Sequence, residues 1–127
     1  MKINSLDHLV LTVANIEVTC QFYRDILGMQ IISFNGGRKA LRFGDQKINL
    51  HQKGHEYEPK AKFPTPGSAD LCLISATPLE EVIAELKSAD ITIEQGPIAK
   101  HGALGDIKSV YVRDPDFNLI EISNYKI

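Results

Sequence analysis

Four side chains that can ligate a metal ion or transfer a proton lie in segments where apolar and polar residues alternate. They are His8, His51, Asp70 and Glu121. The alternate positions in these segments are apolar, so the four groups are predicted to face away from the hydrophobic core. Such groups are costly to bury unless they are paired or bound to metal. Two imidazoles with one or two carboxylates suit a borderline divalent ion, Ni²⁺, Zn²⁺, Mn²⁺ or Fe²⁺. Three or four protein ligands would leave a coordination position open for water or substrate.

The same residues also permit an interpretation without a metal ion. Each histidine can be a strand residue that is hydrogen-bonded to a neighbour, while Asp70 and Glu121 form ion pairs with Arg42 or Arg113. The four residues are far apart in the chain, and no local signature such as HExxH accompanies them. Periodicity alone therefore leaves both interpretations open.

The elements that must position these residues occur in an order that is found twice. Residues 6–13 alternate as a strand, Asn15 is a favourable helix N-cap, and Gly28 is a typical residue just after a helix. Turn-forming residues then separate three further predicted strands, at 29–34, 39–43 and 47–51. The first half is therefore predicted to be β-α-β-β-β.

The second half repeats this order. Residues 69–75 are predicted to form a strand, and Thr77–Glu80 combines a capping box with proline at the first helical position. An apolar stripe along 79–86 predicts a helix that buries one face. Strands are predicted at 92–94, 109–113 and 119–123, the last two joined by a turn at 114–118.

Aligning the two halves places the four candidate ligands at equivalent positions. The first strands pair His8 with Asp70, and the last strands pair His51 with Glu121. An internal repeat of this kind predicts two copies of one structural unit.

We predict an α+β fold of two paired βαβββ modules that form a metal-binding cup. The modules span about 5–52 and 69–125, and residues 53–68 link them. Each module is too small to be stable alone, so residues 1–127 are expected to form a single domain. The linker either covers the mouth of the cup or simply connects the modules.

The composition favours a globular protein that acts on small molecules. The chain has 127 residues and a formal net charge of −2, and 43% of its residues are hydrophobic. It contains no run of Lys and Arg, which argues against a nucleic-acid or anionic-membrane partner. The sequence shows no membrane-length apolar stretch and no signal-peptide core, and it contains two cysteines, so we expect a cytoplasmic protein.

Three segments resemble the vicinal oxygen chelate superfamily, which includes glyoxalase I, bleomycin-binding proteins, fosfomycin-resistance proteins and extradiol dioxygenases. They are DHLVLTV at 7–13, the segment 15–28, and RDPDFNLIEISN at 113–124. The resemblance covers almost the whole chain. Residues 38–51 and 66–74 look more narrowly like the branch named glyoxalase domain-containing protein 5.

The resemblance implies a cup around one divalent metal ion near a homodimer interface, with ligands on the first and last strands of each module. It assigns metal positions to His8, His51, Asp70 and Glu121. Bacterial glyoxalase I is similar but carries Glu at position 51 and His at position 70. Because Asp is shorter than His, Asp70 is expected to reach the metal through water, and the other three are the principal expected ligands.

The resemblance also implies the chemistry. A glyoxalase-like enzyme, a lyase or isomerase, would bind a small molecule with vicinal oxygens, such as the thiol hemiacetal of a 2-oxoaldehyde, and Glu121 would act as general base and then acid. The alternatives are an Fe²⁺ dioxygenase that uses His8, His51 and Glu121, and a module that binds a drug or metabolite without turnover. Further polar residues that share a face with the ligands are candidates for substrate binding: Arg42, Asn49, Tyr111 and Arg113.

Overall fold

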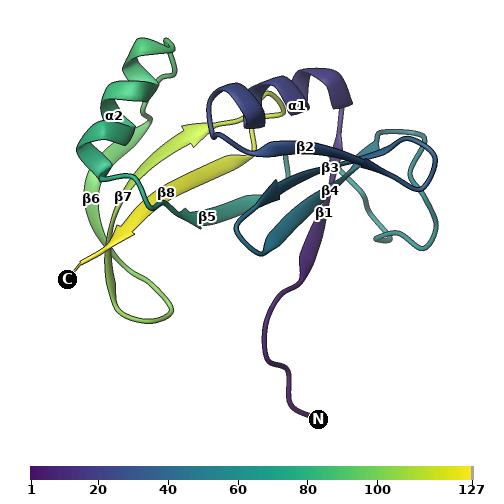
Figure 1. The fold of residues 1–127 in the computed structure, drawn as a ribbon, viewed down its shortest axis with the longest axis horizontal. Helices are drawn as coiled ribbons and strands as arrows, with labels where there is room; N and C mark the ends of the chain where they lie inside the picture. The colour runs from purple at the N-terminus through teal and green to yellow at the C-terminus, as the bar shows by residue number, and fades with distance from the viewer. Residues whose placement is uncertain (127) are drawn as a thin grey trace. The chain divides into compact units, whose positions relative to one another are not determined.

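The computed structural model describes residues 1–126 and contains two compact units, Met1–Gly67 and the chain from Ser68 onward. Each unit holds one helix and one four-stranded mixed sheet in the order β-α-β-β-β (Figure 1). The predicted α+β fold with paired modules is confirmed. No helix within the described residues has the length and apolar character that a membrane span requires.

Unit 1 is built from β1 (His8–Val13), α1 (Ile16–Asp25), β2 (Gln30–Phe34), β3 (Arg38–Phe43) and β4 (Gln46–Gln52). The strand order is β1-β4-β3-β2, and only the β1–β4 pair is parallel. As predicted, Asn15 caps α1, and its side-chain oxygen accepts a hydrogen bond from the amide of Val18 at 3.1 Å.

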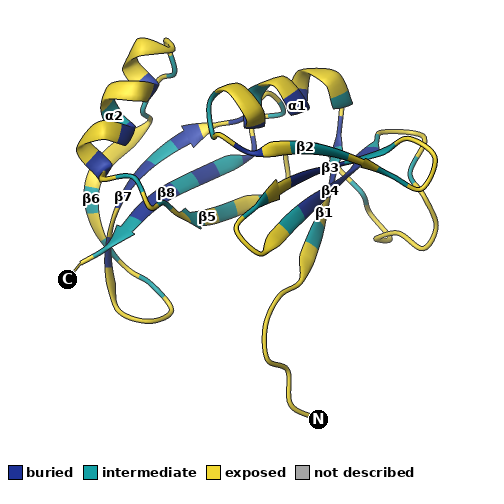
Figure 2. Ribbon diagram, viewed as in Figure 1, coloured by how far each residue is buried: buried dark blue, intermediate teal, exposed yellow. Residues whose placement is uncertain are grey.

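The core of unit 1 lies between α1 and one face of the sheet, because that face carries the apolar positions of every strand. α1 contacts β2, β3 and β4 through its buried residues Thr19, Cys20 and Tyr23. The buried sheet positions include Val13, Leu41, Ile48 and Leu50, and they alternate along the strands with residues that face the other way (Figure 2).

Unit 2 is built from β5 (Asp70–Ile74), α2 (Leu79–Ser88), β6 (Gln95–His101), β7 (Asp106–Arg113) and β8 (Leu119–Tyr125). The strand order is β5-β8-β7-β6, and β5 and β8 are parallel. Its core holds Val110, Val112 and Ile120 of the sheet with Val82 and Leu86 of α2.

Two predicted details of unit 2 are wrong. The strand predicted at 92–94 lies instead at Gln95–His101, where it contains Gly96 and has an irregular register against β7 between Gln95 and Ile98. The capping box at Thr77–Glu80 does not form, because Pro78 is the N-cap residue and provides no side-chain bond. The amide of Leu79 donates to the side-chain oxygen of Asn124 on β8, at 2.7 Å.

Candidate functional site

Each sheet has a face opposite its helix, and we call this the polar face. In unit 1 the register pairs His8 with Lys47, Val10 with Asn49, and Thr12 with His51. Residues paired in this way point to the same side of a sheet. The polar face of unit 1 therefore carries His8, Arg38, Arg42, Lys47, Asn49 and His51.

The register corrects the alignment of the two halves. In unit 2, Asp70 is paired with Leu119 and Cys72 with Glu121, so Glu121 lies two residues further along β8 than the partner of Asp70. The residue that lies two positions beyond the partner of His8 is Asn49, not His51. Asn49 is therefore the structural equivalent of Glu121.

The corrected register separates the two predicted histidine ligands. His51 is paired with Thr12, four residues from His8, so the two histidines are displaced by about 13 Å along the strands. Two ligands of one metal ion have to bring their donor atoms within about 4 Å of each other. His8 and His51 of one unit therefore cannot ligate the same ion side by side.

His8 lies at the exposed start of β1 with one ring nitrogen engaged. Its Nδ1 is 2.8 Å from a carboxylate oxygen of Asp7. A carboxylate accepts hydrogen bonds and does not donate them, so the imidazole donates from Nδ1 and leaves Nε2 as its acceptor atom. A histidine oriented in this way by a carboxylate is a common arrangement for metal ligands.

His51 is buried, with 3% of its surface exposed. The ring of Tyr57 packs edge-on against its imidazole, with centroids 5.5 Å apart. Burial, together with the nearby Arg38 charge, holds the pKa of His51 below its ordinary value. Its imidazole is therefore neutral at pH 7. Tyr57 lies in the segment predicted as a linker, and part of that segment packs back onto unit 1.

Glu121 lies half-buried on the polar face of unit 2 and is held by serine hydroxyls. Ser109 donates to Glu121 Oε2 at 2.6 Å, and the Oγ atoms of Ser109 and Ser123 are also 2.6 Å apart. The Sγ of Cys72 lies 3.4 Å from Ser123 Oγ. Ser109 gives its single proton to the carboxylate, so Ser123 is left to donate to Ser109 Oγ at 2.6 Å or to Glu121 Oε2 at 3.4 Å. The shorter contact is the better hydrogen bond, and Cys72 can then donate to Ser123.

Tyr111 and Asp70 complete the surroundings of Glu121. Tyr111 is directly opposite Glu121 on β7, and Asp70 is its diagonal neighbour on β5. Burial and hydrogen bonding to Glu121 raise the pKa of Tyr111, so its phenol stays protonated. Burial raises the pKa of Cys72 as well, and the negative charges of Glu121 and Asp70 add to that effect. Unit 2 thus presents two carboxylates beside a phenol and a thiol.

The remaining predicted substrate residues have different surroundings. Arg42 is exposed on β3. Asn49 is 8% exposed, and its side-chain oxygen is buried with no hydrogen-bond partner among the described residues. Arg113 forms a two-pronged ion pair with Glu94, at 3.0 and 2.9 Å, so its guanidinium is already engaged.

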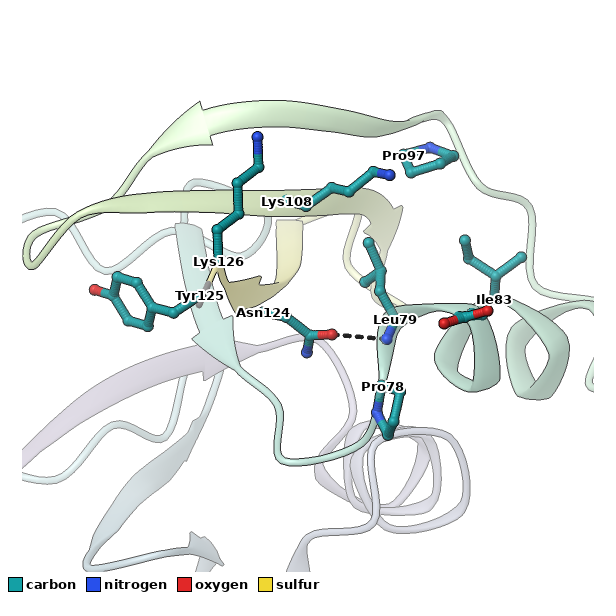
Figure 3. Close-up of a pocket in the computed structure, with 9 residues that line it drawn as sticks. Pro78, Leu79, Ile83, Pro97, Lys108, Asn124, Tyr125 and Lys126 are labelled. Carbon is teal, nitrogen blue, oxygen red and sulfur yellow. Dashed lines mark hydrogen bonds between the residues drawn. The ribbon is translucent and has the colours of Figure 1, made fainter.

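A groove of about 530 Å³ lies elsewhere, on the helix side of unit 2 (Figure 3). Pro78, Leu79 and Ile83 line it from the α2 side, where the Asn124 side chain bonds to the start of the helix. None of the predicted site residues lines this groove. Within residues 1–126, no three His, Cys, Asp or Glu side chains are clustered closely enough to hold a metal ion.

The family follows from comparison with known proteins. The family model of the Glyoxalase/Bleomycin resistance protein/Dioxygenase superfamily matches residues 5–122. The chain belongs to this superfamily. Among superfamily members, it is 56% identical over 125 residues to the virulence protein STM3117 of Salmonella typhimurium, covering 98% of this chain and 87% of that protein. The crystal structure of STM3117 matches with a TM-score of 0.98 and covers 99% of this chain and 100% of that one.

Two further relatives differ in how they are named. The glyoxalase domain-containing protein RDO1 of Mycosarcoma maydis is 50% identical over 126 residues, covering 99% of this chain and 71% of the relative. The metallothiol transferase FosB of Staphylococcus epidermidis is 26% identical over 122 residues, covering 96% and 82%. The narrower resemblance to glyoxalase domain-containing protein 5 stays a prediction.

Several residues of the polar faces were not among those predicted from the sequence. Ser109 and Ser123 have the same strand parity as Glu121, which is a signal that they share its face. Arg38 has the same parity as Arg42 and could have been found in the same way. Nothing in the local sequence indicates that Tyr57 packs on His51, because that contact depends on how residues 53–60 fold back.

Proposed function

We propose that this superfamily member is a divalent-metal-dependent, glyoxalase-like enzyme that acts on a small molecule with vicinal oxygens, such as the thiol hemiacetal of a 2-oxoaldehyde. The observation that carries the proposal is the environment of Glu121. Ser109 holds Oε2 of its carboxylate, and Tyr111 is a second hydrogen-bond partner of the same side chain, so the carboxylate is oriented on the polar face of unit 2. Membership of the superfamily supports the same class of chemistry.

The donor groups on the polar faces fit a divalent ion, with one change from the set predicted from the sequence. We propose His8, Asp70 and Glu121 as ligands, and the unpartnered side-chain oxygen of Asn49 in place of His51. The four residues take equivalent positions on the first and last strands of the two units. One nitrogen and three oxygen donors are richer in oxygen than the original set, which favours Mn²⁺ among the four candidate ions.

The proposed ligands belong to both units, and we propose that the protein acts as a homodimer. A bound divalent ion would polarise the substrate carbonyl and stabilise negative charge on its oxygens.

The protein's own groups would handle the proton. Glu121 would remove a proton from the carbon next to the carbonyl and return one to the neighbouring carbon, as base and then acid. Ser109 and Tyr111 would hold the Glu121 carboxylate in place for this proton transfer. The Tyr111 phenol, which lies opposite Glu121, would have to turn from the carboxylate to donate a hydrogen bond to a substrate oxygen.

The structure argues against the dioxygenase alternative with the three ligands that the sequence predicted for it. That form needs His8, His51 and Glu121 around one Fe²⁺, and the register displaces His51 from His8 by about 13 Å. The relative named metallothiol transferase supports a different variation, in which a thiol is transferred to a substrate held by the same face.

Metal content is the first test. The full-length protein is stripped with a chelator, incubated separately with Mn²⁺, Ni²⁺, Zn²⁺ and Fe²⁺, and analysed for metal per chain. We expect retention by the wild type and by His51→Ala, and loss in His8→Ala and Glu121→Ala. Failure of the wild type to retain any ion would refute the metal proposal, and loss in His51→Ala equal to that in His8→Ala would refute the revised ligand set.

Activity is tested on the metal-loaded protein with methylglyoxal and either glutathione or cysteine, by following thioester formation. We expect thioester from the wild type and none from Glu121→Gln. If the loaded wild type forms no thioester with either thiol, the glyoxalase-like reaction is refuted. Oxygen uptake with catechols would then support the dioxygenase class, and ligand binding without turnover would support a binding module.

A further inference from the structure

Arg38 on β3 has a buried hydrogen-bond donor with no acceptor. Its Nε is inaccessible to solvent, and no hydrogen-bond partner for it lies within the described part of the chain. Other arginines are neutralised: Arg24 bonds to Asp25 at 2.8 Å, and Arg113 bonds to Glu94 through two nitrogens. An unsatisfied buried donor on a charged group is unfavourable, so such a group is usually held ready for a ligand.

Two aromatic rings lie next to the Arg38 guanidinium. Its central carbon lies 4.1 Å from the centroid of the Tyr57 ring and 5.4 Å from that of Phe34. A guanidinium stacked in this way keeps its N–H groups in its own plane, where they can form a fork for a two-oxygen acceptor. The stacking also reduces the rotamer freedom that binding would otherwise remove.

His51 provides a second polar group beside Arg38. The antiparallel β3–β4 register, continued from Ala40 opposite Asn49, places Arg38 opposite His51 on the polar face. The imidazole is buried, and Tyr57 contacts both side chains. Arg38, His51 and Tyr57 therefore form one cluster, which we call the Arg38 cluster.

The carboxylate nearest to the cluster is already engaged. Glu56 Oε2 accepts the amide hydrogen of Gly54 at 2.8 Å, and its Oε1 lies 3.7 Å from the ammonium of Lys60. The ammonium nitrogen of Lys47 lies 4.3 Å from the centroid of the Phe34 ring. The positive charge of Arg38 is thus left without a hydrogen-bonded counter-charge in unit 1, in a neighbourhood that holds two further cations.

We propose that the Arg38 cluster is a binding subsite for the oxyanion of a small molecule, a carboxylate or a phosphate. Arg38 would bind two oxygens through its Nε and one terminal nitrogen after a shift of the neighbouring side chains that uncovers Nε, and the His51 imidazole would donate to the same anion. Tyr57 and Phe34 would keep the fork in place. The subsite uses residues of unit 1 alone, and it stands whether or not a metal ion binds at His8 and Glu121.

The test is an NMR titration of the full-length protein, with chelator present to exclude divalent ions. Acetate and inorganic phosphate are the probes, and sodium chloride at equal ionic strength is the reference. We expect a saturable shift of the Arg38 Nε–H signal and of the His51 ring signals with acetate or phosphate, but not with chloride. The anion that binds more tightly identifies the ligand as a carboxylate or a phosphate.

Substitutions at two arginines of β3 separate a specific subsite from general attraction to positive charge. Arg38→Gln is expected to weaken anion binding by at least about tenfold, whereas Arg42→Gln, four residues away on the same face, is expected to change it by less than about twofold. Arg38→Lys keeps the charge but loses the fork, so we expect weakened binding that is still measurable. Tyr57→Leu removes the aromatic ring next to Arg38 without changing any charge, and it is expected to weaken anion binding because the guanidinium is then held less firmly.

Two results would overturn the proposal. One is the absence of any saturable shift at Arg38 with either anion in the wild type, a measurement that does not depend on a variant folding. The other is an equal loss in Arg42→Gln and Arg38→Gln, which would indicate diffuse attraction to surface charge. Glu121→Gln, which removes the proposed catalytic base, is expected to leave anion binding unchanged, so failure of the enzyme proposal and failure of this one are distinguishable.

Discussion

Replacing Ser109 with alanine tests whether Glu121 is held by a directed chain of hydrogen bonds. Ser109 is fully buried, so water cannot replace its hydroxyl. It donates to a carboxylate at 2.6 Å, and a hydrogen bond to a charged group contributes about 1.5–3 kcal/mol. We therefore expect Ser109→Ala to lower the free energy of unfolding by about 1.5–3 kcal/mol.

Ser123→Ala is the matched control, because it removes a buried hydroxyl from the same cluster but leaves the short bond from Ser109 to the carboxylate in place. The Ser123 hydroxyl itself lies 3.4 Å from Glu121 Oε2, a much longer contact. The bond from Ser123 to Ser109 joins two neutral groups, so its loss should cost about 0.5–1.5 kcal/mol. Neutralising the acceptor gives a second control. In a Glu121→Gln background the cost of Ser109→Ala should fall to a similar value, about 0.5–1.5 kcal/mol, which gives a positive coupling energy in the double-mutant cycle.

Urea unfolding of the full chain at pH 7 measures these differences, provided that the dependence on urea concentration is the same in all variants. The reasoning would be refuted if Ser123→Ala cost as much as Ser109→Ala. It would also be refuted if Ser109→Ala cost the same with glutamine at position 121 as with glutamate, because the charge on the acceptor would then make no difference.

Two further predictions concern unit 2. Asn124→Ala should lower the free energy of unfolding by about 1.5–3 kcal/mol, because the Asn124 side chain bonds to the amide of Leu79 and to the carbonyls of Ser75 and Thr77. Thr77→Ala should change it by less than about 0.5 kcal/mol. If urea unfolding gave the reverse order, the capping box at Thr77 would be the correct interpretation. Arg113→Gln should reduce stability at neutral pH, since the Arg113 hydrogen bond holds the pKa of Glu94 below its ordinary value of 4.5. A carboxylate with a lowered pKa in the folded state contributes stability above pH 4.5, and the contribution is lost as the pH falls through the lowered value. The difference in unfolding temperature between wild type and variant should therefore become smaller in acid, where the bond from Arg113 to the carbonyl of Phe117 remains. A difference that did not decrease there would contradict the ion-pair explanation.

The sequence alone was sufficient for the order of elements and for which face of each strand is polar. Alternation reports the two faces directly, because successive side chains in a strand point to opposite sides. Local signals also located Asn15 as the cap of α1 and the turn at 114–118, where the buried Asp114 accepts the amide hydrogens of Asp116 and Asn118. In each case the interacting groups are within five residues of one another.

Tertiary structure decided the contacts between distant segments. The start of α2 is bonded by Asn124, which is 45 residues away in the chain. Nothing near Thr77 could indicate that, and the local capping box was the natural but wrong prediction. The packing of Tyr57 on His51 and Arg38 likewise depends on the path of a loop, which no periodic pattern records.

At the candidate metal site, strand β4 alone shows which properties the sequence determines and which depend on the tertiary structure. Asn49 and His51 have the same parity on β4, so alternation places both on the polar face and cannot choose between them. The choice depends on the register of the parallel β1–β4 pair, which pairs Val10 with Asn49 and Thr12 with His51. That register is set by the packing of distant strands and α1 together, and a shift of two residues leaves every side chain on its original face. The sequence therefore determined the face on which the chemistry lies, and only the folded sheet decided that Asn49, and not His51, is the nearer of the two to His8.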